Sequence, residues 1–141
     1  MLRQIAVGLG AGFLLLVLDG VIHANPLAQR LYAVYEPLAR PRVNALLGSA
    51  IDLAYGVILA VIFVRLLPSL PGSSGVAKGL SFGLLVWFLR VVMSVAGEWV
   101  TKTTPPATHA YVLLTGLLQI VVVSVLLGAL LTPRSGPGPA P

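Results

Sequence analysis

Acidic and imidazole side chains stand near one end of each apolar segment of this chain. Asp19 and His23 are four residues apart, so they would share one face of a helix. Asp52, Tyr55, Glu98 and His109 lie at the start or end of the later apolar segments. Carboxylates and imidazoles that converge on one surface could bind a divalent metal or relay protons. No HExxH or comparable paired-ligand motif accompanies them, so hydrated side chains at an interface are the alternative interpretation.

Asp19 and Arg90 form a second candidate group, inside the apolar segments. Asp19 follows Gly8 by the same spacing as Arg90 follows Gly79, so the two charges would lie at equal depth. An unpaired charge near the centre of a bilayer costs about 2.5–3.5 kcal/mol. We therefore predict an ion pair between Asp19 and Arg90. We favour a structural role for this pair over a mechanistic one.

The composition excludes a water-soluble globule. Of 141 residues, 57% are hydrophobic and 9% are charged, and the mean hydropathy is +0.98, whereas soluble domains carry roughly 25% charged residues. The net charge is +5, but the nine Lys and Arg residues are scattered singly beside apolar segments, so no nucleic-acid partner is expected. The absence of cysteine excludes disulfides, thiolate catalysis and iron–sulfur clusters. We expect no cofactor.

Four apolar segments approach the ~20 residues that a membrane-spanning helix needs. They run from Ile5 to His23, Leu46 to Leu67, Lys78 to Val100, and Ala110 to Leu131. The first also resembles a secretory signal peptide. The connection 25–45 is predicted to hold a short interfacial amphipathic helix, with a plain loop as the alternative. The sequence thus predicts an all-α membrane protein, with one four-helix domain over residues 1–132 and a disordered Pro/Gly-rich tail over 133–141.

An internal duplication links the first and third segments. A shift of the chain by 71 residues aligns Gly8 with Gly79 and Gly12 with Gly83. Small residues four apart let helices approach closely in lipid. We predict two parallel two-helix repeats, about 1–70 and 71–132, whose first helices contact each other through these glycines. Chance similarity between apolar segments is the alternative.

Three motifs carry a family resemblance. They are Asp-Gly-x-x-His at 19–23, Ala-Tyr-Gly at 54–56, and Lys-Gly-Leu-x-Phe-Gly-Leu-Leu-Val-Trp at 78–87. With these motifs the chain resembles a group of small uncharacterised bacterial four-helix integral membrane proteins over most of residues 5–131. The resemblance implies the fold and a location in the bacterial inner membrane. It implies no activity and no functional residues.

Membrane orientation rests on the acidic residues, because Lys and Arg divide four against four between the two sides. All four acids lie toward the side opposite the termini, so the side with the termini keeps uncompensated positive charge. We therefore place both termini in the cytoplasm. We expect the lipid bilayer as a partner, with a homo-oligomer or a larger membrane complex.

Three functions follow from these residues. The first is a non-enzymatic accessory, scaffold or assembly component that acts through helix packing. The first alternative is a small proton-coupled transporter that uses Asp19. The second alternative is a metal-binding protein that uses His23, Glu98 and His109. A polar cavity at mid-depth would favour transport, and clustered ligands would favour metal binding. The absence of both features would favour a scaffold.

Overall fold

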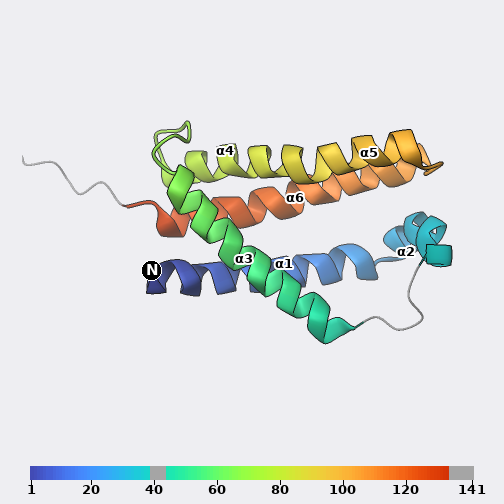
Figure 1. The fold of residues 1–141 in the computed structure, drawn as a ribbon, viewed down its shortest axis with the longest axis horizontal. Coiled ribbons are helices and arrows are strands. Elements are labelled where there is room, and N and C mark those ends of the chain that lie inside the picture. The colour runs from blue at the N-terminus through green and yellow to red at the C-terminus, as the bar shows by residue number, and fades with distance from the viewer. Residues whose placement is uncertain (39–43, 134–141) are drawn as a thin grey trace, which may run out of the picture.

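The protein is all-helical in the residues that its computed structural model describes, 1–38 and 44–133 (Figure 1). Four helical stretches in this part of the chain are long and apolar enough to cross a membrane, as predicted. In chain order the elements are α1 (Leu2–Ala24), α2 (Pro26–Tyr32), the 3-10 helix η1 (Ala33–Leu38), α3 (Ala45–Leu66), α4 (Gly75–Trp87), the π turn η2 (Phe88–Val92), α5 (Met93–Thr101) and α6 (Pro106–Leu131). The predicted tail falls outside the described residues from 134 onward.

Side-chain caps and prolines fix where these helices begin. The side-chain oxygens of Asn25, Asn44 and Ser74 accept hydrogen bonds from backbone N–H groups at the starts of α2, α3 and α4, at 2.9, 3.0 and 3.1 Å. A proline occupies the first turn of α2 and of α6, where its missing N–H costs nothing. The first connection therefore contains helical structure over 26–38, as predicted, and not a plain loop.

The long helices form two hairpins that meet through α6. α1 packs on α3, and α4 packs on α6, while α6 also contacts α1. In Figure 1, α6 lies between α1 and the α4–α5 stretch, and α3 crosses α1 obliquely. The start of α1, the connection between α3 and α4, and the end of α6 share one end of the molecule. The prediction that the first and third apolar segments pack on each other was wrong, because each packs mainly within its own hairpin and α6 separates them.

Glycines form the contact surface within each hairpin. A Cβ atom added at Gly8 or Gly12 would lie 2.7 or 2.6 Å from a backbone Cα atom of α3, and one at Gly79 would lie 2.9 Å from the Cα of Val125 in α6. These distances leave no room for a side chain. The contact at Gly83 is less close, because an added Cβ would lie 3.0 Å from the Cβ of Ser124 and 3.1 Å from the Cα of Val121 in α6. The four predicted glycines therefore lie at helix contacts, but their partners are α3 and α6 and not each other.

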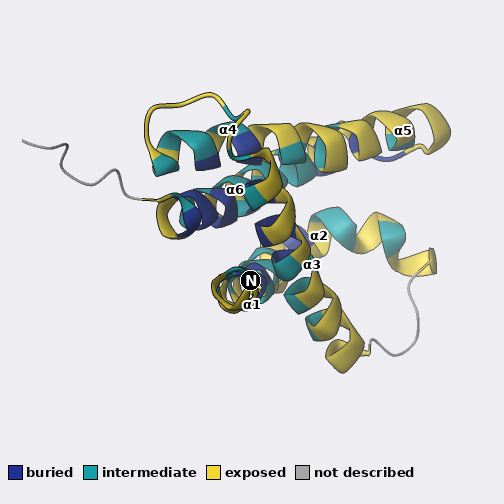
Figure 2. Cartoon of the chain, turned by 60° about the vertical axis from the view of Figure 1, so that its left-hand side comes forward, coloured by how far each residue is buried: buried dark blue, intermediate teal, exposed yellow. Residues whose placement is uncertain are grey.

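Buried residues lie where the helices meet, and exposed residues lie on the outward faces (Figure 2). The exposed residues include many large apolar ones. The rings of Phe63 and Phe82 meet edge to face, with centroids 5.3 Å apart, and join α3 to α4. Only 22–28% of each apolar window is buried within the chain. Most of the hydrophobic surface of the four helices therefore needs a covering from outside the chain.

Candidate functional site

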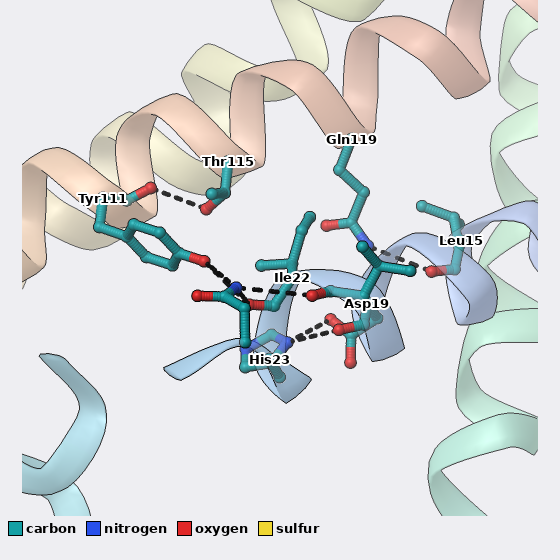
Figure 3. Close-up of polar contacts among 9 residues, drawn as sticks. Leu15, Asp19, Ile22, His23, Tyr111, Thr115 and Gln119 are labelled. Atoms are coloured by element: carbon teal, nitrogen blue, oxygen red, sulfur yellow. Dashed lines mark hydrogen bonds and ion pairs between the residues drawn. The ribbon is translucent and has the colours of Figure 1, made fainter. Parts of the chain in front are cut away.

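Asp19 and His23 lie one turn apart on α1 and contact each other, as the spacing predicts. Their Oδ1 and Nδ1 atoms are 3.3 Å apart, and both side chains are about half exposed, at 48% and 49%. His23 Nδ1 also lies 2.9 Å from the carbonyl oxygen of Asp19. That oxygen can only accept, so the proton sits on Nδ1 and donates to it. The Nε2 atom is then the one that can gain or lose a proton (Figure 3).

Arg90 does not pair with Asp19. Within the described residues, the ion pairs shorter than 4.0 Å are Asp19–His23 and Glu98–Lys102. The guanidinium of Arg90 instead lies 4.2 Å from the ring centroid of Tyr55, in a cation–π contact. The predicted ion pair was therefore wrong. Equal depth along two helices does not bring side chains together when a third helix, α6, lies between them (Figure 1).

One face of α6 carries polar residues toward α1. Tyr111, Thr115 and Gln119 are spaced by four residues, so they share this face. Gln119 Nε2 donates to the carbonyl oxygen of Leu15 at 3.3 Å, and the Tyr111 hydroxyl donates to that of Ile22 at 2.8 Å (Figure 3). Asn25 Nδ2 in turn donates to the Tyr111 hydroxyl at 2.8 Å. These bonds hold the two hairpins together through polar groups inside apolar segments.

A polar cleft of about 220 Å³ opens beside this face, between α1, α2, the π turn, α5 and α6. Its polar lining residues are His23, Tyr32, Arg90, Ser94, Thr115 and Gln119. The Tyr32 ring stacks on the His23 ring, with centroids 5.1 Å apart. Gln119 lies at the middle of α6, and Arg90 lies near the middle of the stretch 75–101. The cleft therefore places polar groups at mid-length of the apolar helices.

The π turn shapes one wall of the polar cleft. A π turn inserts an extra residue into a helix, and such turns are frequent at functional sites. Arg90 and Val91 both belong to it. A Cβ atom added at Gly116 of α6 would lie 2.9 Å from the Val91 side chain. A side chain at residue 116 would therefore have to displace the Val91 side chain of the π turn.

Glu98 belongs to a separate cluster that ties η1 to α5. Its carboxylate accepts hydrogen bonds from the Tyr35 hydroxyl at 2.8 Å and from Lys102 Nζ at 3.0 Å. Burial, together with the hydrogen bond to the Glu98 carboxylate, raises the pKa of Tyr35 above its usual range. Tyr35 therefore keeps its proton at neutral pH and acts as the donor.

The predicted metal cluster is not formed in the described part of the chain, where no group of three His, Cys, Asp or Glu side chains could hold an ion. His23 contacts Asp19, Glu98 contacts Tyr35 and Lys102, and Asp52 makes no ion pair there. His109 is buried with both ring nitrogens unbonded, beside the Trp99 ring at 5.3 Å. The residues share one end of the molecule but face different neighbours.

Three lining residues of the polar cleft were not predicted from the sequence: Tyr32, Ser94 and Thr115. A signal for Thr115 was available in the four-residue spacing of Tyr111, Thr115 and Gln119, which marks a polar stripe on an otherwise apolar helix. No signal pointed to Tyr32, because its position depends on how α2 folds back onto α1. Comparison with known proteins adds no residue to this site: no family model, no curated protein and no solved structure matches the chain.

Proposed function

We propose that the chain is a multi-pass membrane protein that moves a small polar solute through the polar cleft, coupled to proton binding at Asp19 and His23. The observation that carries this proposal is the polar cleft itself. It reaches the middle of α6 and of the stretch 75–101 and the end of α1, which are three of the four helical stretches long and apolar enough to cross a membrane. Transmembrane helices have little reason to enclose polar groups there unless something polar passes or binds.

Asp19 and His23 supply the proton site in this proposal. Asp19 lacks the arginine neighbour within 4.0 Å that would keep its carboxylate charged, and His23 keeps Nε2 free to exchange a proton beside the polar cleft. Gln119, Thr115 and Ser94 would orient the solute by hydrogen bonds.

The membrane setting and the duplication belong to the same proposal. We place the four spans in a bacterial inner membrane with both termini in the cytoplasm, on the resemblance and on the distribution of acids. The two hairpins would descend from one duplicated two-helix unit. The equivalent use of Gly8 and Gly12 against α3, and of Gly79 and Gly83 against α6, supports this origin.

Proton flux in proteoliposomes tests the transport proposal. The purified chain is reconstituted with a pH-sensitive dye inside, an inward proton gradient is imposed, and cationic, neutral and anionic solutes are added in turn. We expect one class to cause a solute-dependent pH change that Asp19→Asn abolishes. Glu36→Gln is the control, because it removes an exposed acid of η1 outside the polar cleft. Flux undiminished by Asp19→Asn, or no flux with any class from correctly folded protein, would overturn the proposal.

The second candidate is an accessory or assembly component, alone or as a homo-oligomer. Arg90 favours it, since this mid-length cation has no ion-pair partner within 4.0 Å in residues 1–38 and 44–133, and an acid of another chain could supply one. Single cysteines placed along the exposed helix faces of this cysteine-free chain test it by cross-linking in native membranes. Cross-links confined to the Arg90 face would support assembly, and none on any face would exclude it.

A further inference from the structure

Arg90 presents unused hydrogen-bond donors at mid-length of an apolar stretch. Its guanidinium carries five N–H donors, and none of them donates to an acceptor in the part of the chain that the structure describes. Asp19 and Asp52 attract it electrostatically but lie beyond ion-pair distance. The π contact with Tyr55 occupies the face of the guanidinium and leaves its edge open to an anion.

An apolar groove of about 450 Å³ runs from Arg90 along the seam between α3 and α4. Tyr55 and Arg90 lie at one end of this groove, and Leu66 and Phe82 lie at the other. Between them the walls are hydrocarbon side chains, such as Ile58 and Ile62 of α3, Leu85 of α4 and Leu89 of the π turn. From residue 55 to residue 66 the groove is roughly 16 Å long at 1.5 Å per residue, which is the reach of a fatty acyl tail.

The lining of the α3–α4 groove favours a flexible chain over a partner helix. Helices pack in membranes where small residues let their backbones approach. No glycine, alanine, serine or threonine lines this groove, because Gly56 and Ala60 of α3 face α1 instead. Bulky branched side chains would hold a second helix away, whereas a single acyl chain fits between them.

We propose that the α3–α4 groove binds one long-chain fatty acid, with its tail along Ile58, Ile62 and Leu85 and its carboxylate on Arg90 and the Tyr55 hydroxyl. Arg90 also lines the polar cleft, so water in the cleft would hydrate the outer side of the carboxylate. The groove has room for one tail, and its cation lies near mid-depth, so a free fatty acid fits better than a two-chain phospholipid. The site borders the polar cleft at Arg90 but uses neither Asp19 nor His23, so fatty-acid binding does not require the proposed proton coupling.

Photo-crosslinking of the full chain in lipid nanodiscs tests this site. The probe is palmitate with a diazirine in its tail, and peptide mass spectrometry locates the adducts. We expect adducts on the α3 and α4 walls, displaced by palmitate but not by hexadecanol. Arg90→Gln should weaken labelling about tenfold to a hundredfold, as expected for loss of a charge-assisted hydrogen-bond pair. Ile62→Trp, which fills the groove, should abolish it.

A second apolar groove supplies the matched control. It lies between α4 and α6, measures about 320 Å³, and is lined by leucines and Val121 with no charged residue. Leu118→Trp fills it and should leave labelling of the α3–α4 groove unchanged. Asp19→Asn, which removes a negative charge that attracts Arg90, should not weaken this labelling, whether or not transport is lost. Equal labelling of both grooves, equal competition by hexadecanol, or insensitivity to Arg90→Gln in a folded variant would overturn the proposal. Exclusion of the probe by a co-purified protein at this groove would show a partner helix instead.

Discussion

A methyl group added at Gly12 should separate α1 from α3, whereas a methyl group added at Gly10 should not. The Cβ of Gly12→Ala would lie 2.6 Å from the Cα of Leu53 and 2.7 Å from the carbonyl oxygen of Asp52. Both are backbone atoms, so no side-chain rotation can relieve the clash. The Cβ of Gly10→Ala would have no heavy atom within 4 Å.

The comparison isolates the packing energy. Replacing a helical glycine by alanine stabilises the helix by roughly 0.5–1 kcal/mol, and this gain is common to both variants. Overpacking a close contact costs about 1–3 kcal/mol. The free energy of unfolding of Gly12→Ala should therefore fall below that of Gly10→Ala by about 1–3 kcal/mol, with Gly10→Ala at or above the parent.

Energy transfer between dyes can measure this difference. The chain has no cysteine, so Leu2→Cys and Leu66→Cys supply two labelling sites where α1 begins and α3 ends, at the same end of the molecule (Figure 1). Loss of transfer during titration with a denaturing detergent reports separation of the two helices. Equal unfolding free energies for the two alanine variants would refute the claim that α1 and α3 meet through their backbones.

Three further predictions concern the second hairpin, the joint between hairpins and the first connection. Gly128→Ala should lower the thermal stability of the purified protein relative to Gly97→Ala. A Cβ at residue 128 would lie 2.9 Å from a backbone Cα of α4, whereas a Cβ at residue 97 would have no heavy atom within 4 Å. Gln119→Leu should cost about 0.5–1.5 kcal/mol in a detergent unfolding titration, because the bond to the Leu15 carbonyl is lost. Tyr35 should ionise above the usual tyrosine pKa of about 10, so its contribution to stability is complete below that pH and is lost as the pH rises through the raised value. An ultraviolet titration in which Tyr35→Phe removes one late-ionising tyrosine would confirm this, and an unchanged titration curve would contradict it.

Apolar length and spacing sufficed to predict the long helices of this fold. The four apolar segments became helices within a few residues of their expected bounds, since ~20 consecutive apolar residues leave few alternatives. The connection 25–45 was expected to hold a short helix, and Asn25 caps the start of α2 there. The glycines were expected at helix contacts because only close backbone approach makes their lack of a side chain useful.

Partners could not be predicted in the same way. A stripe such as Gly8 and Gly12 shows that some backbone comes near, but it does not show which one. The complementary small residue, Gly56, belongs to the Ala-Tyr-Gly motif in the middle of α3, but that motif does not show that α1 is the helix it contacts. Likewise the rise per residue gives the depth of Asp19 and Arg90, whereas their lateral neighbours depend on how α6 inserts between the hairpins.

The π turn explains why the charged residues were harder to predict than the helices that carry them. Periodicity assumes an uninterrupted α-helix, so an extra residue at 88–92 changes the facing of Arg90 and of everything after it. Three costly features then coincide at one position: a break in the regular helix, a mid-length arginine without an ion-pair acid within 4.0 Å in the described residues, and a polar cleft among apolar helices. Departures from local regularity concentrate at functional sites. The coincidence makes Arg90, which borders both the polar cleft and the α3–α4 groove, a better starting point for finding the ligand than the glycine contacts that hold the hairpins together.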